Sequence, residues 1–546
     1  MEKEKKSRIV FYNGEILTME KRSAGTAVLV EDGKIRALGD AGELLEAAGD
    51  AARVDLEGNT LMPAFVDAHS HFTQVAFSTL QASLEGAGSR EEAVGKLQAF
   101  LRTARPPKGA WVLARDYDHT AFPDGRHLTL AELDGAAPEN PLFVQHKSGH
   151  IGLFNSLALK LLGVRPDTPS PEGGRIGKED GRLTGYMEEN ALFAFQKRVP
   201  MPGPEELEGA FEKAQKLYAS FGITTVQDGM AVKEMLPLYD MLLGKDLLWL
   251  DLAAYPDPET YALAKRAYPG CMETYWKGLR FGGMKIFLDG SPQGRTAWMR
   301  TPYLGGTEDR GAKEARSENA KEYCGYGTMT DENVLEAMGE AAREETQLLA
   351  HCNGDAAAEQ YLRCLERAEE DWPGLGGLRP VLIHGQLIGR DQLPRAARLG
   401  VILSLFVAHV YHWGDVHIRN FGLERACKIS PAASALRCGI PVTFHQDAPV
   451  ILPDMFETIW CAVRRLTKQG VLLGGEERIS PAQALRAVTI NAAYQYGEEK
   501  RKGSIVPGKQ ADLIVTDKNP LKAPAKELRN IQVLRTYKEG VCVYSR

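Results

Sequence analysis

The sequence predicts an α/β protein: a (β/α)8 TIM barrel with a small β-sandwich built from both chain ends and a subdomain inserted after the first barrel strand. Three observations predict this class. The chain has 546 residues, more than one hydrophobic core usually fills. Its middle alternates strand-like apolar runs with segments of helical periodicity. Both ends show the apolar–polar alternation of half-buried strands.

The two chain ends are expected to pair with each other. Residues 1–60 alternate apolar and polar positions around two turn signals, Asn13-Gly14 and Asp32-Gly33. Residues 500–546 repeat this style, with apolar runs such as 513–515. Because exposed strand edges need partners, we expect these two segments to form one β-sandwich cap.

Residues 61–499 contain eight apolar runs that are the expected barrel strands. The runs are residues 61–66, 223–227, 247–253, 283–288, 348–350, 380–383, 401–405 and 441–444. Helices are expected between them: one begins at Pro204, and Thr330 caps another whose first turn is acidic. Eight strands with intervening helices favour a barrel over a doubly wound sheet.

The interval between the first two strands is too long for one βα unit. His71 and Ile223 lie 152 positions apart, so we expect an inserted subdomain at about residues 75–200. This segment contains a helical pattern with Val94 and Leu97 on one face.

Charge and cysteine content exclude several classes of protein. The 66 Lys and Arg residues nearly balance the 72 Asp and Glu residues, which disfavours nucleic acid as a partner. The eight cysteines lack CxxC spacing and predict reduced thiols in a cytoplasmic protein. We find no signal-peptide core, and the longest apolar run, 401–410, is too short to cross a bilayer. No membrane partner is therefore expected.

A pair of histidines, His69 and His71, follows the first expected barrel strand. Residues i and i+2 of an extended chain point to the same side, so both imidazoles can reach one metal ion. By itself such a pair is equally compatible with two polar loop histidines. Its place at the end of a barrel strand favours the ligand reading, because that face of a barrel carries the catalytic residues.

Four further candidates lie at the ends of later strands: Lys285, His351, His384 and Asp447. His351 and His384 are 33 residues apart, which is one βα repeat. A buried lysine is costly unless it is neutralised. Three interpretations of Lys285 follow: it pairs with a carboxylate such as Asp289, it points out of the barrel toward a helix, or it adds carbon dioxide to become a carbamate that bridges two divalent cations. For Asp447 the competing interpretation is a turn residue.

Taken together, these segments resemble the metal-site motifs of the amidohydrolase superfamily. The similarity is greatest to the amidohydrolase family 3 branch, which includes N-substituted formamide deformylase-like proteins. The resemblance rests on residues 69–71, 284–291, 350–356, 383–385 and 446–449, with 146–156 in the insertion and 503–513 near the C-terminus. It therefore covers nearly the whole chain.

The resemblance implies a centre of two metal ions, Zn²⁺ or another divalent first-row metal. Its implied ligands are His69 and His71 for the buried ion, carboxylated Lys285 as the bridge, His351 and His384 for the outer ion, and Asp447. A metal-bridging hydroxide would attack the carbonyl of an amide or other C–N bond, with Asp447 as general base and then general acid. Neutral imidazoles and carboxylate-like oxygens are ligands that suit such ions.

Three residues are candidates for substrate binding: His150, Asp289 and Arg295. His150 could instead form a hydrogen bond within the insertion, and Asp289 and Arg295 could pair with each other. His445 occupies a position where this branch more often has a small residue. Its imidazole is expected either near the metal or against the barrel wall.

Two alternatives to a binuclear amidohydrolase stay open at this point. One is a mononuclear deaminase of the same superfamily, which needs no bridging carbamate. The other is a non-catalytic metal-binding regulatory protein, which the intact ligand set disfavours because buried polar groups are costly to keep. The expected partners are a small amide-type substrate and further copies of the chain in a homo-oligomer. Formamides, N-acyl amino acids, cyclic amides and ureas are all compatible substrates.

Overall fold

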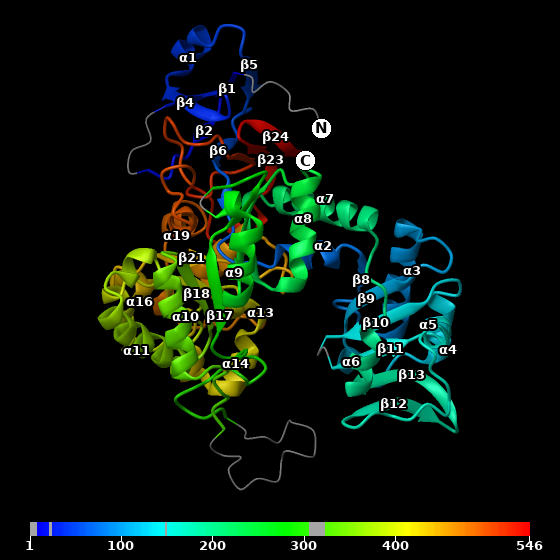
Figure 1. The fold of residues 1–546 in the computed structure, drawn as a ribbon. Coiled ribbons are helices and arrows are strands. Elements are labelled where there is room, and N and C mark those ends of the chain that lie inside the picture. The colour runs from blue at the N-terminus through cyan, green and yellow to red at the C-terminus, as the bar shows by residue number, and fades with distance from the viewer. Residues whose placement is uncertain (1–7, 21–24, 148–149, 273, 305–322) are drawn as a thin grey trace. The chain divides into compact units, whose positions relative to one another are not determined.

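The computed structural model describes residues 8–20, 25–147, 150–272, 274–304 and 323–546 (Figure 1). The chain divides into two compact units. Met1–Thr73 and Ala214–Arg546 form the first, which we call the main unit, and Gln74–Lys213 form the second, which we call the 74–213 unit.

Two β-sheets of the main unit are built from the chain ends. The first has the order β4-β3-β1-β5 and consists of β1 (Ile9–Tyr12), β3 (Ala27–Glu31), β4 (Lys34–Gly39) and β5 (Ala52–Asp55), with α1 (Ala41–Ala47) before β5. The second has the order β2-β6-β22-β23-β24 and consists of β2 (Glu15–Ile16), β6 (Thr60–Pro63), β22 (Leu513–Thr516), β23 (Val533–Lys538) and β24 (Val541–Ser545). Phe11 and Val28 of the first sheet share a buried cluster with Leu61, Leu513 and Tyr537 of the second. Residues from opposite ends of the chain therefore share one core.

Two parallel sheets form the middle of the main unit. One has the order β16-β15-β14-β7 and consists of β7 (Phe65–Val66), β14 (Ile223–Ala231), β15 (Asp251–Pro256) and β16 (Leu279–Phe281). The other has the order β17-β18-β19-β20-β21 and consists of β17 (Gly283–Phe287), β18 (Gln347–Cys352), β19 (Val381–His384), β20 (Ile402–Leu405) and β21 (Val442–Phe444).

The two parallel sheets share side-chain packing. Gly282 alone separates β16 from β17. One buried cluster contains Val66 and Tyr255 from the first sheet together with Leu349 and Ile383 from the second. Among the described residues, no strand ladder joins β16 to β17 or β21 to β7. The fold is thus α/β with parallel strands arranged as two sheets.

One expected strand begins later than its apolar run, 247–253, indicated. β15 begins at Asp251. The backbone N–H groups of Trp249 and Leu250 donate to Gln215 Oε1, at 2.8 and 3.1 Å. Because a side chain accepts these hydrogen bonds, the two residues do not join the strand ladder. The other seven expected runs all overlap observed strands.

Helices connect the parallel strands. They are α2 (Phe72–Ser78), α7 (Pro204–Ser220), α8 (Leu236–Gly244), α9 (Pro258–Ala267), α10 (Asp331–Arg343), α11 (Asp355–Asp371), α12 (Leu393–Arg398), α13 (His409–His412), α14 (Gly414–Phe421), α15 (Leu423–Ala426), α16 (Ala432–Arg437), α17 (Met455–Arg464), α18 (Pro481–Ala487) and α19 (Ile490–Gln495). Two predicted helix starts are confirmed. α7 begins at Pro204, and Thr330 Oγ1 caps α10 by accepting a hydrogen bond from the Asn333 N–H at 3.4 Å.

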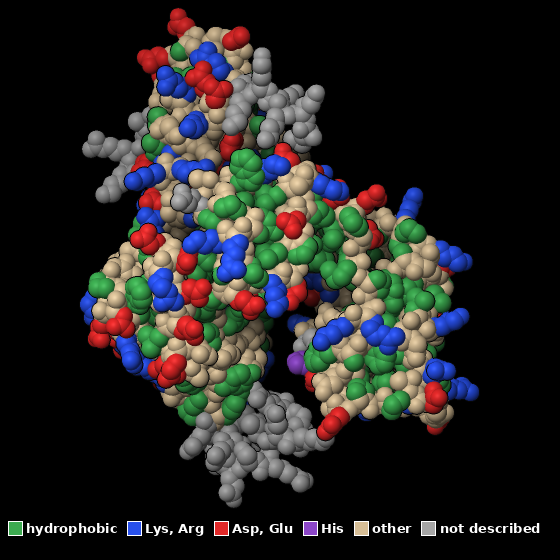
Figure 2. All heavy atoms as spheres, in the orientation of Figure 1, with side chains coloured by type: hydrophobic (Ala, Val, Ile, Leu, Met, Phe, Trp, Pro, Cys, Tyr) green, Lys and Arg blue, Asp and Glu red, His purple; other side chains and the backbone are tan. Residues whose placement is uncertain are grey.

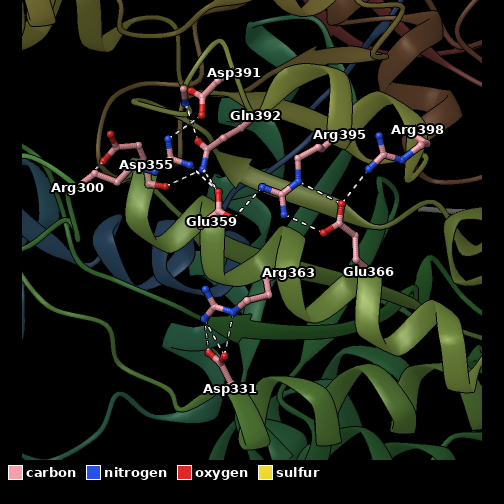
Figure 3. A network of polar contacts seen from close by, with 11 residues as sticks. Arg300, Asp331, Asp355, Glu359, Arg363, Glu366, Asp391, Gln392, Arg395 and Arg398 are labelled. Atoms are coloured by element: carbon pink, nitrogen blue, oxygen red, sulfur yellow. Dashed lines mark hydrogen bonds and ion pairs between the residues drawn. The ribbon is translucent and has the colours of Figure 1, made fainter.

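An ion-pair network joins α10, α11 and α12 (Figure 3). Arg395 of α12 binds both carboxylate oxygens of Glu366, at 3.1 and 2.8 Å, and donates to Glu359 at 2.7 Å. Arg363 binds both oxygens of Asp331. Such bidentate pairs fix geometry better than single ion pairs do. The network therefore helps to position α11, which follows the strand that carries His351.

The 74–213 unit contains one six-stranded sheet with the order β12-β13-β11-β10-β9-β8. Its strands are β8 (Gln81–Ser83), β9 (Val112–Tyr117), β10 (Leu142–His146), β11 (Ile151–Phe154), β12 (Gly174–Glu179) and β13 (Arg182–Glu189), and its helices are α3 (Arg90–Ala104), α4 (Leu130–Ala136), α5 (Ser156–Leu161) and α6 (Asn190–Gln196). β8, β9 and β10 are parallel, and the remaining pairs are antiparallel. The predicted apolar helix is α3, where Leu97 is fully buried.

Both signs of charge are present on the face of the molecule drawn in Figure 2. Lys and Arg side chains lie among Asp and Glu side chains over this face, as the near balance of 66 positive and 72 negative residues indicates. Within the part of the chain that the structure describes, no helix has the length and apolar character needed to span a membrane.

Candidate metal centre

His69 and His71 lie just beyond β7, and both face Asp447. His69 Nε2 is 3.3 Å and His71 Nε2 is 3.1 Å from Asp447 Oδ1. The ligand atoms of the three residues all lie within 4.8 Å of one another. A backbone hydrogen bond of 2.8 Å from the His71 N–H to the Ala448 carbonyl holds the two segments together. The two imidazoles and the carboxylate therefore form one compact donor set.

The ring of His69 is oriented by its second nitrogen. His69 Nδ1 is hydrogen-bonded to Gln227 Oε1 from β14, which leaves Nε2 directed at Asp447. Gly229 makes room for the ring, because a Cβ atom there would lie 2.4 Å from His69 Cε1. Burial, reinforced by the nearby Lys285 amine, holds the pKa of His69 well below its usual range. His69 is thus neutral, the form that binds metal ions.

Asp447 lies three residues beyond β21 and is 15% exposed. Its backbone has a φ of 55°, in the left-handed region that Asp tolerates better than most residues. Burial acts to raise the pKa of Asp447, but the hydrogen bond from His71 and the nearby imidazoles of His384 and His69 together keep the pKa well below its usual value. The carboxylate is therefore ionised and available as a ligand and proton acceptor.

Lys285 is in the middle of β17 and is fully buried. Its Nζ lies 3.0 Å from His69 Nε2 and 5.0 Å from the centre of the Phe287 ring. Burial lowers the pKa of Lys285 to about 8, although the Asp447 carboxylate opposes this shift. A substantial fraction of the amine is therefore neutral near pH 8.

His351 and His384 bring two more imidazoles to this end of the sheets. His351 is the penultimate residue of β18, and His384 is the last residue of β19. Their ring centres are 4.6 Å apart, and His384 Nε2 is 4.0 Å from Asp447 Oδ2. The centre of the His69 ring lies 5.5 Å from that of His384. All six residues that were expected to bind metal thus gather at one end of the parallel strands.

His445 contacts His384 instead of joining the donor set directly. It is fully buried, with Nε2 3.0 Å from His384 Nδ1 and Nδ1 2.9 Å from Ser404 Oγ. Burial lowers the pKa of His445 to about 3, so the ring is neutral. Because His445 contacts Nδ1 of His384, the other ring nitrogen of His384, Nε2, is directed toward Asp447.

Asp289 is buried among backbone donors. Its carboxylate accepts hydrogen bonds from the N–H groups of Trp298, Asn353 and Gly354, at 3.0, 2.9 and 2.7 Å. Asp289 Oδ1 also lies 3.4 Å from His351 Nδ1. Because both oxygens already have protein partners, this geometry favours positioning of the His351 segment over direct contact with a substrate.

The other two candidates for substrate binding also have protein partners. Arg295 has a φ of 57°, and its Nε donates to Asn420 Oδ1 at 3.0 Å. His150 belongs to the 74–213 unit, where its Nδ1 lies 3.1 Å from Glu189 Oε2 and its side chain is 60% exposed.

Two residues that support the site went unrecognised in the sequence. Gln227 orients His69, and the adjacent Asp228 accepts hydrogen bonds from the Thr73 hydroxyl and from Tyr239 Oη, the latter at 3.0 Å. Both lie in the middle of β14, where the expected strand run 223–227 ends. Polar residues at the end of an expected strand are the signal that identified His351 and His384. The same signal could have identified Gln227 and Asp228.

Two histidines after β20 have partners of their own. His409 Nδ1 lies 3.1 Å from His417 Nε2, and His412 Nε2 lies 2.8 Å from Glu457 Oε1. His409 also packs edge-on against Phe406, which in turn lies near His445.

Comparison with known proteins identifies the family. The model of the amidohydrolase family matches residues 52–544. The chain belongs to the amidohydrolase family. The resemblance seen in the sequence motifs is therefore confirmed.

Individual relatives match over nearly their whole length. The N-substituted formamide deformylase of Arthrobacter pascens is 29% identical over 556 residues, which cover 98% of this chain and 98% of the relative. Protein LONG AFTER FAR-RED 3 of Arabidopsis thaliana is 26% identical, with 97% of this chain and 91% of the relative covered. Membership of this family supports a hydrolytic enzyme that acts on a small molecule.

The solved structures agree on the fold. The crystal structure of an uncharacterized metal-dependent hydrolase from Pyrococcus horikoshii OT3 superposes with a TM-score of 0.75 at 24% identity. The match covers 95% of this chain and 99% of that one. The solved structure therefore supports the fold, and the family supports an amidohydrolase.

Proposed function

We propose that this chain is a metal-dependent hydrolase that cleaves an amide or other C–N bond of a small molecule at a binuclear centre. The residues that would hold the metal are His69, His71, Lys285, His351, His384 and Asp447. One observation carries the proposal: the donor atoms of His69, His71 and Asp447 lie within 4.8 Å of one another, beside a buried lysine whose Nζ is 3.0 Å from His69 Nε2.

The donor set suits a zinc-sized ion. Ligand distances of about 2.0–2.2 Å around a tetrahedral ion place neighbouring ligand atoms about 3.3–3.6 Å apart. Asp447 Oδ1 lies 3.3 Å from His69 Nε2 and 3.1 Å from His71 Nε2. Neutral imidazoles with carboxylate oxygens are typical of Zn²⁺ and similar first-row ions. When bound, such an ion supplies Lewis acidity toward a carbonyl oxygen and lowers the pKa of a water ligand.

Lys285 is suited to become the bridging carbamate. Its neutral amine would attack the carbon of carbon dioxide, forming an N–C bond and releasing one proton. Burial favours this step, because it lowers the pKa of Lys285 to about 8 and so supplies the unprotonated nucleophile. The product is a carboxylate on a strand that otherwise offers no acidic ligand.

Asp447 is suited to move the proton. Its ionised carboxylate would accept a proton from the attacking water and return it to the leaving nitrogen. The hydrogen bond from His71 and the contact of Oδ2 with His384 Nε2 at 4.0 Å orient it for this role. Asp289 would act as a positioning residue for the His351 segment, and His150 and Arg295 stay proposed substrate-binding residues.

We also propose that the parallel strands form a (β/α)8 barrel over residues 61–499. The cap would consist of residues 1–60 and 500–546, and the inserted subdomain would span about 75–200. The buried cluster shared by the two parallel sheets supports this arrangement. An experimental structure with a solvent gap between β21 and β7 would contradict it.

The Lys285→Ala variant tests the proposed centre. We expect it to lose metal-dependent hydrolysis and one bound metal equivalent relative to the unaltered chain, measured by turnover and elemental analysis, because the bridge is removed. Short carboxylic acids should partly restore turnover by replacing the carbamate. The exposed Lys428→Ala variant is the control. Full activity of Lys285→Ala at trace metal would refute the carbamate.

The substrate search should begin with N-substituted formamides, followed by N-acyl amino acids, cyclic amides and ureas. The formamides come first because a relative that matches 98% of this chain is an N-substituted formamide deformylase. One metal equivalent bound at this centre at full activity would favour a mononuclear deaminase instead. Absence of turnover with every class would favour a non-catalytic metal-binding protein.

A further inference from the structure

A second group of metal-binding side chains lies in the 74–213 unit. Asp118 and His119 directly follow β9, and His146 ends β10. The two strands are parallel neighbours, and His146 pairs with Tyr117 in their register. The Lys147 N–H also donates to the Tyr117 carbonyl at 2.8 Å. The carboxyl ends of the strands therefore meet, and they bring the three side chains together.

The three donor atoms have the spacing of ligands around one ion. His119 Nδ1 lies 3.2 Å from His146 Nε2, and His146 Nε2 lies 3.8 Å from Asp118 Oδ1. All three atoms lie within 4.8 Å of one another. Ligand atoms about 2.0–2.1 Å from a tetrahedral ion are about 3.3–3.4 Å apart. An ion of this size would need only small side-chain movements.

Surrounding groups hold these side chains in place. The Thr120 N–H and hydroxyl donate to Asp118 Oδ1, at 3.0 and 2.6 Å. The His127 ring stacks on His119 with ring centres 3.8 Å apart, and Tyr117 Oη lies 3.3 Å from His127 Nδ1. The hydrogen bonds to Asp118 are of the kind that orients carboxylate ligands of metal ions in proteins, and the stacked His127 ring packs against His119.

The protonation states suit metal binding as well. His146 is only 9% exposed, and burial, followed by the neighbouring His119, lowers its pKa. Burial acts to raise the pKa of Asp118, but the hydrogen bonds from Thr120 and the nearby His146 and Lys147 together lower it. A neutral imidazole and an ionised carboxylate are the forms that coordinate metals.

We propose that Asp118, His119 and His146 bind a divalent first-row ion such as Zn²⁺, held by residues of the 74–213 unit alone. The ion would join the ends of β9 and β10 and order the loop that begins at Asp118. Three protein ligands leave a fourth position for water or for an anionic oxygen of a small molecule, as in zinc sites that are not purely structural.

Zinc binding to the full-length chain tests the proposal. The His69→Ala, His71→Ala double variant removes the first centre's histidine pair and leaves the 74–213 unit unchanged. After treatment with EDTA, re-equilibration with Zn²⁺ and dialysis, elemental analysis gives zinc per chain. We expect at least one equivalent in this background, and one equivalent fewer when Asp118→Asn is added.

The control is Asp124→Asn in the same background. It is the same substitution in the same unit, at a carboxylate that pairs with Arg90 at 3.0 Å, and we expect no loss of zinc.

Asp118→Asn preserves side-chain volume, and circular dichroism reports whether the fold is kept. If that variant unfolds, His119→Gln in the same background takes its place, with loss of one zinc equivalent again as the expected result. No zinc in the double variant, or equal zinc with and without Asp118→Asn, would overturn the proposal.

Discussion

The metal centre and the ion-pair network of α10, α11 and α12 contain ionisable residues in opposite states. In the metal centre, burial lowers the pKa of Lys285 to about 8 and that of His445 to about 3, so both groups lose charge readily. In the network, burial acts to raise the pKa of Glu359, but hydrogen bonds from Arg395 and Gln392 outweigh it and lower the pKa to about 2. Glu359 therefore stays charged.

Exposure and pairing explain this difference. Lys285 is fully buried and its nearest polar partner is a neutral imidazole, so the cost of burying its charge is not repaid. The Arg395 side chain is 28% exposed and contacts two carboxylates. Water and opposite charges stabilise the ionised forms there. Variants of the centre should therefore change metal binding, whereas variants of the network should change stability.

The largest effect should come from His445→Ala. Removal of the partner of His384 Nδ1 should weaken metal binding about 10–100-fold, the usual cost of losing a group that orients a metal ligand. Competition with a chelator measures the zinc affinity, and circular dichroism shows that the fold is kept. His412→Ala is the control, because its partner is Glu457. Unchanged zinc affinity in His445→Ala would show that His384 needs no such support.

A smaller effect is expected from Gly229→Ala. The new Cβ would lie 2.4 Å from His69 Cε1, so the ring or the strand must move, at a cost of about 1–3 kcal/mol in unfolding free energy. Zinc affinity should fall with it, because His69 is displaced. Gly244→Ala is the matched control: no atom lies within 4 Å of its Cβ position, so we expect stability to stay equal or rise by up to about 1 kcal/mol. Equal urea midpoints for the two variants would contradict this packing.

The smallest effect is expected from Glu359→Gln, and it depends on pH. The pKa of Glu359 in the folded chain, about 2, lies below its ordinary value of 4.5. Its contribution to stability is therefore fully present above pH 4.5 and is lost as the pH falls toward 2. Urea denaturation between pH 7 and pH 3 should show a shallower acid loss in Glu359→Gln than in the unaltered chain. If the difference between Glu359→Gln and Glu359 chains disappears when Arg395 is replaced by Ala in both, the Glu359–Arg395 ion pair is its source. An equal loss of stability at acid pH in Glu359→Gln and the unaltered chain would contradict a contribution from this pair.

Most residues of the proposed metal centre could be predicted from the sequence, and the structure brings them close together. His69, His71, Lys285, His351 and His384 each follow or interrupt an apolar run, and parallel strands place such positions at one end of their sheets. Gln227 escaped notice because it closes an apolar run without being a common metal ligand. The start of β15 was placed too early because Gln215, on α7, accepts the hydrogen bonds that Trp249 and Leu250 would otherwise contribute to a strand.

The residue types of the proposed centre, the order of the parallel strands and the two β-rich ends could all be inferred from the sequence. These follow from local apolar runs and from spacings along the chain. Only the tertiary structure decided that His445 supports His384, that Asp289 binds backbone N–H groups, and that Asp118, His119 and His146 converge. Such contacts join residues that are separated along the chain, and burial and hydrogen bonding in the folded state select among the many partners that sequence alone allows.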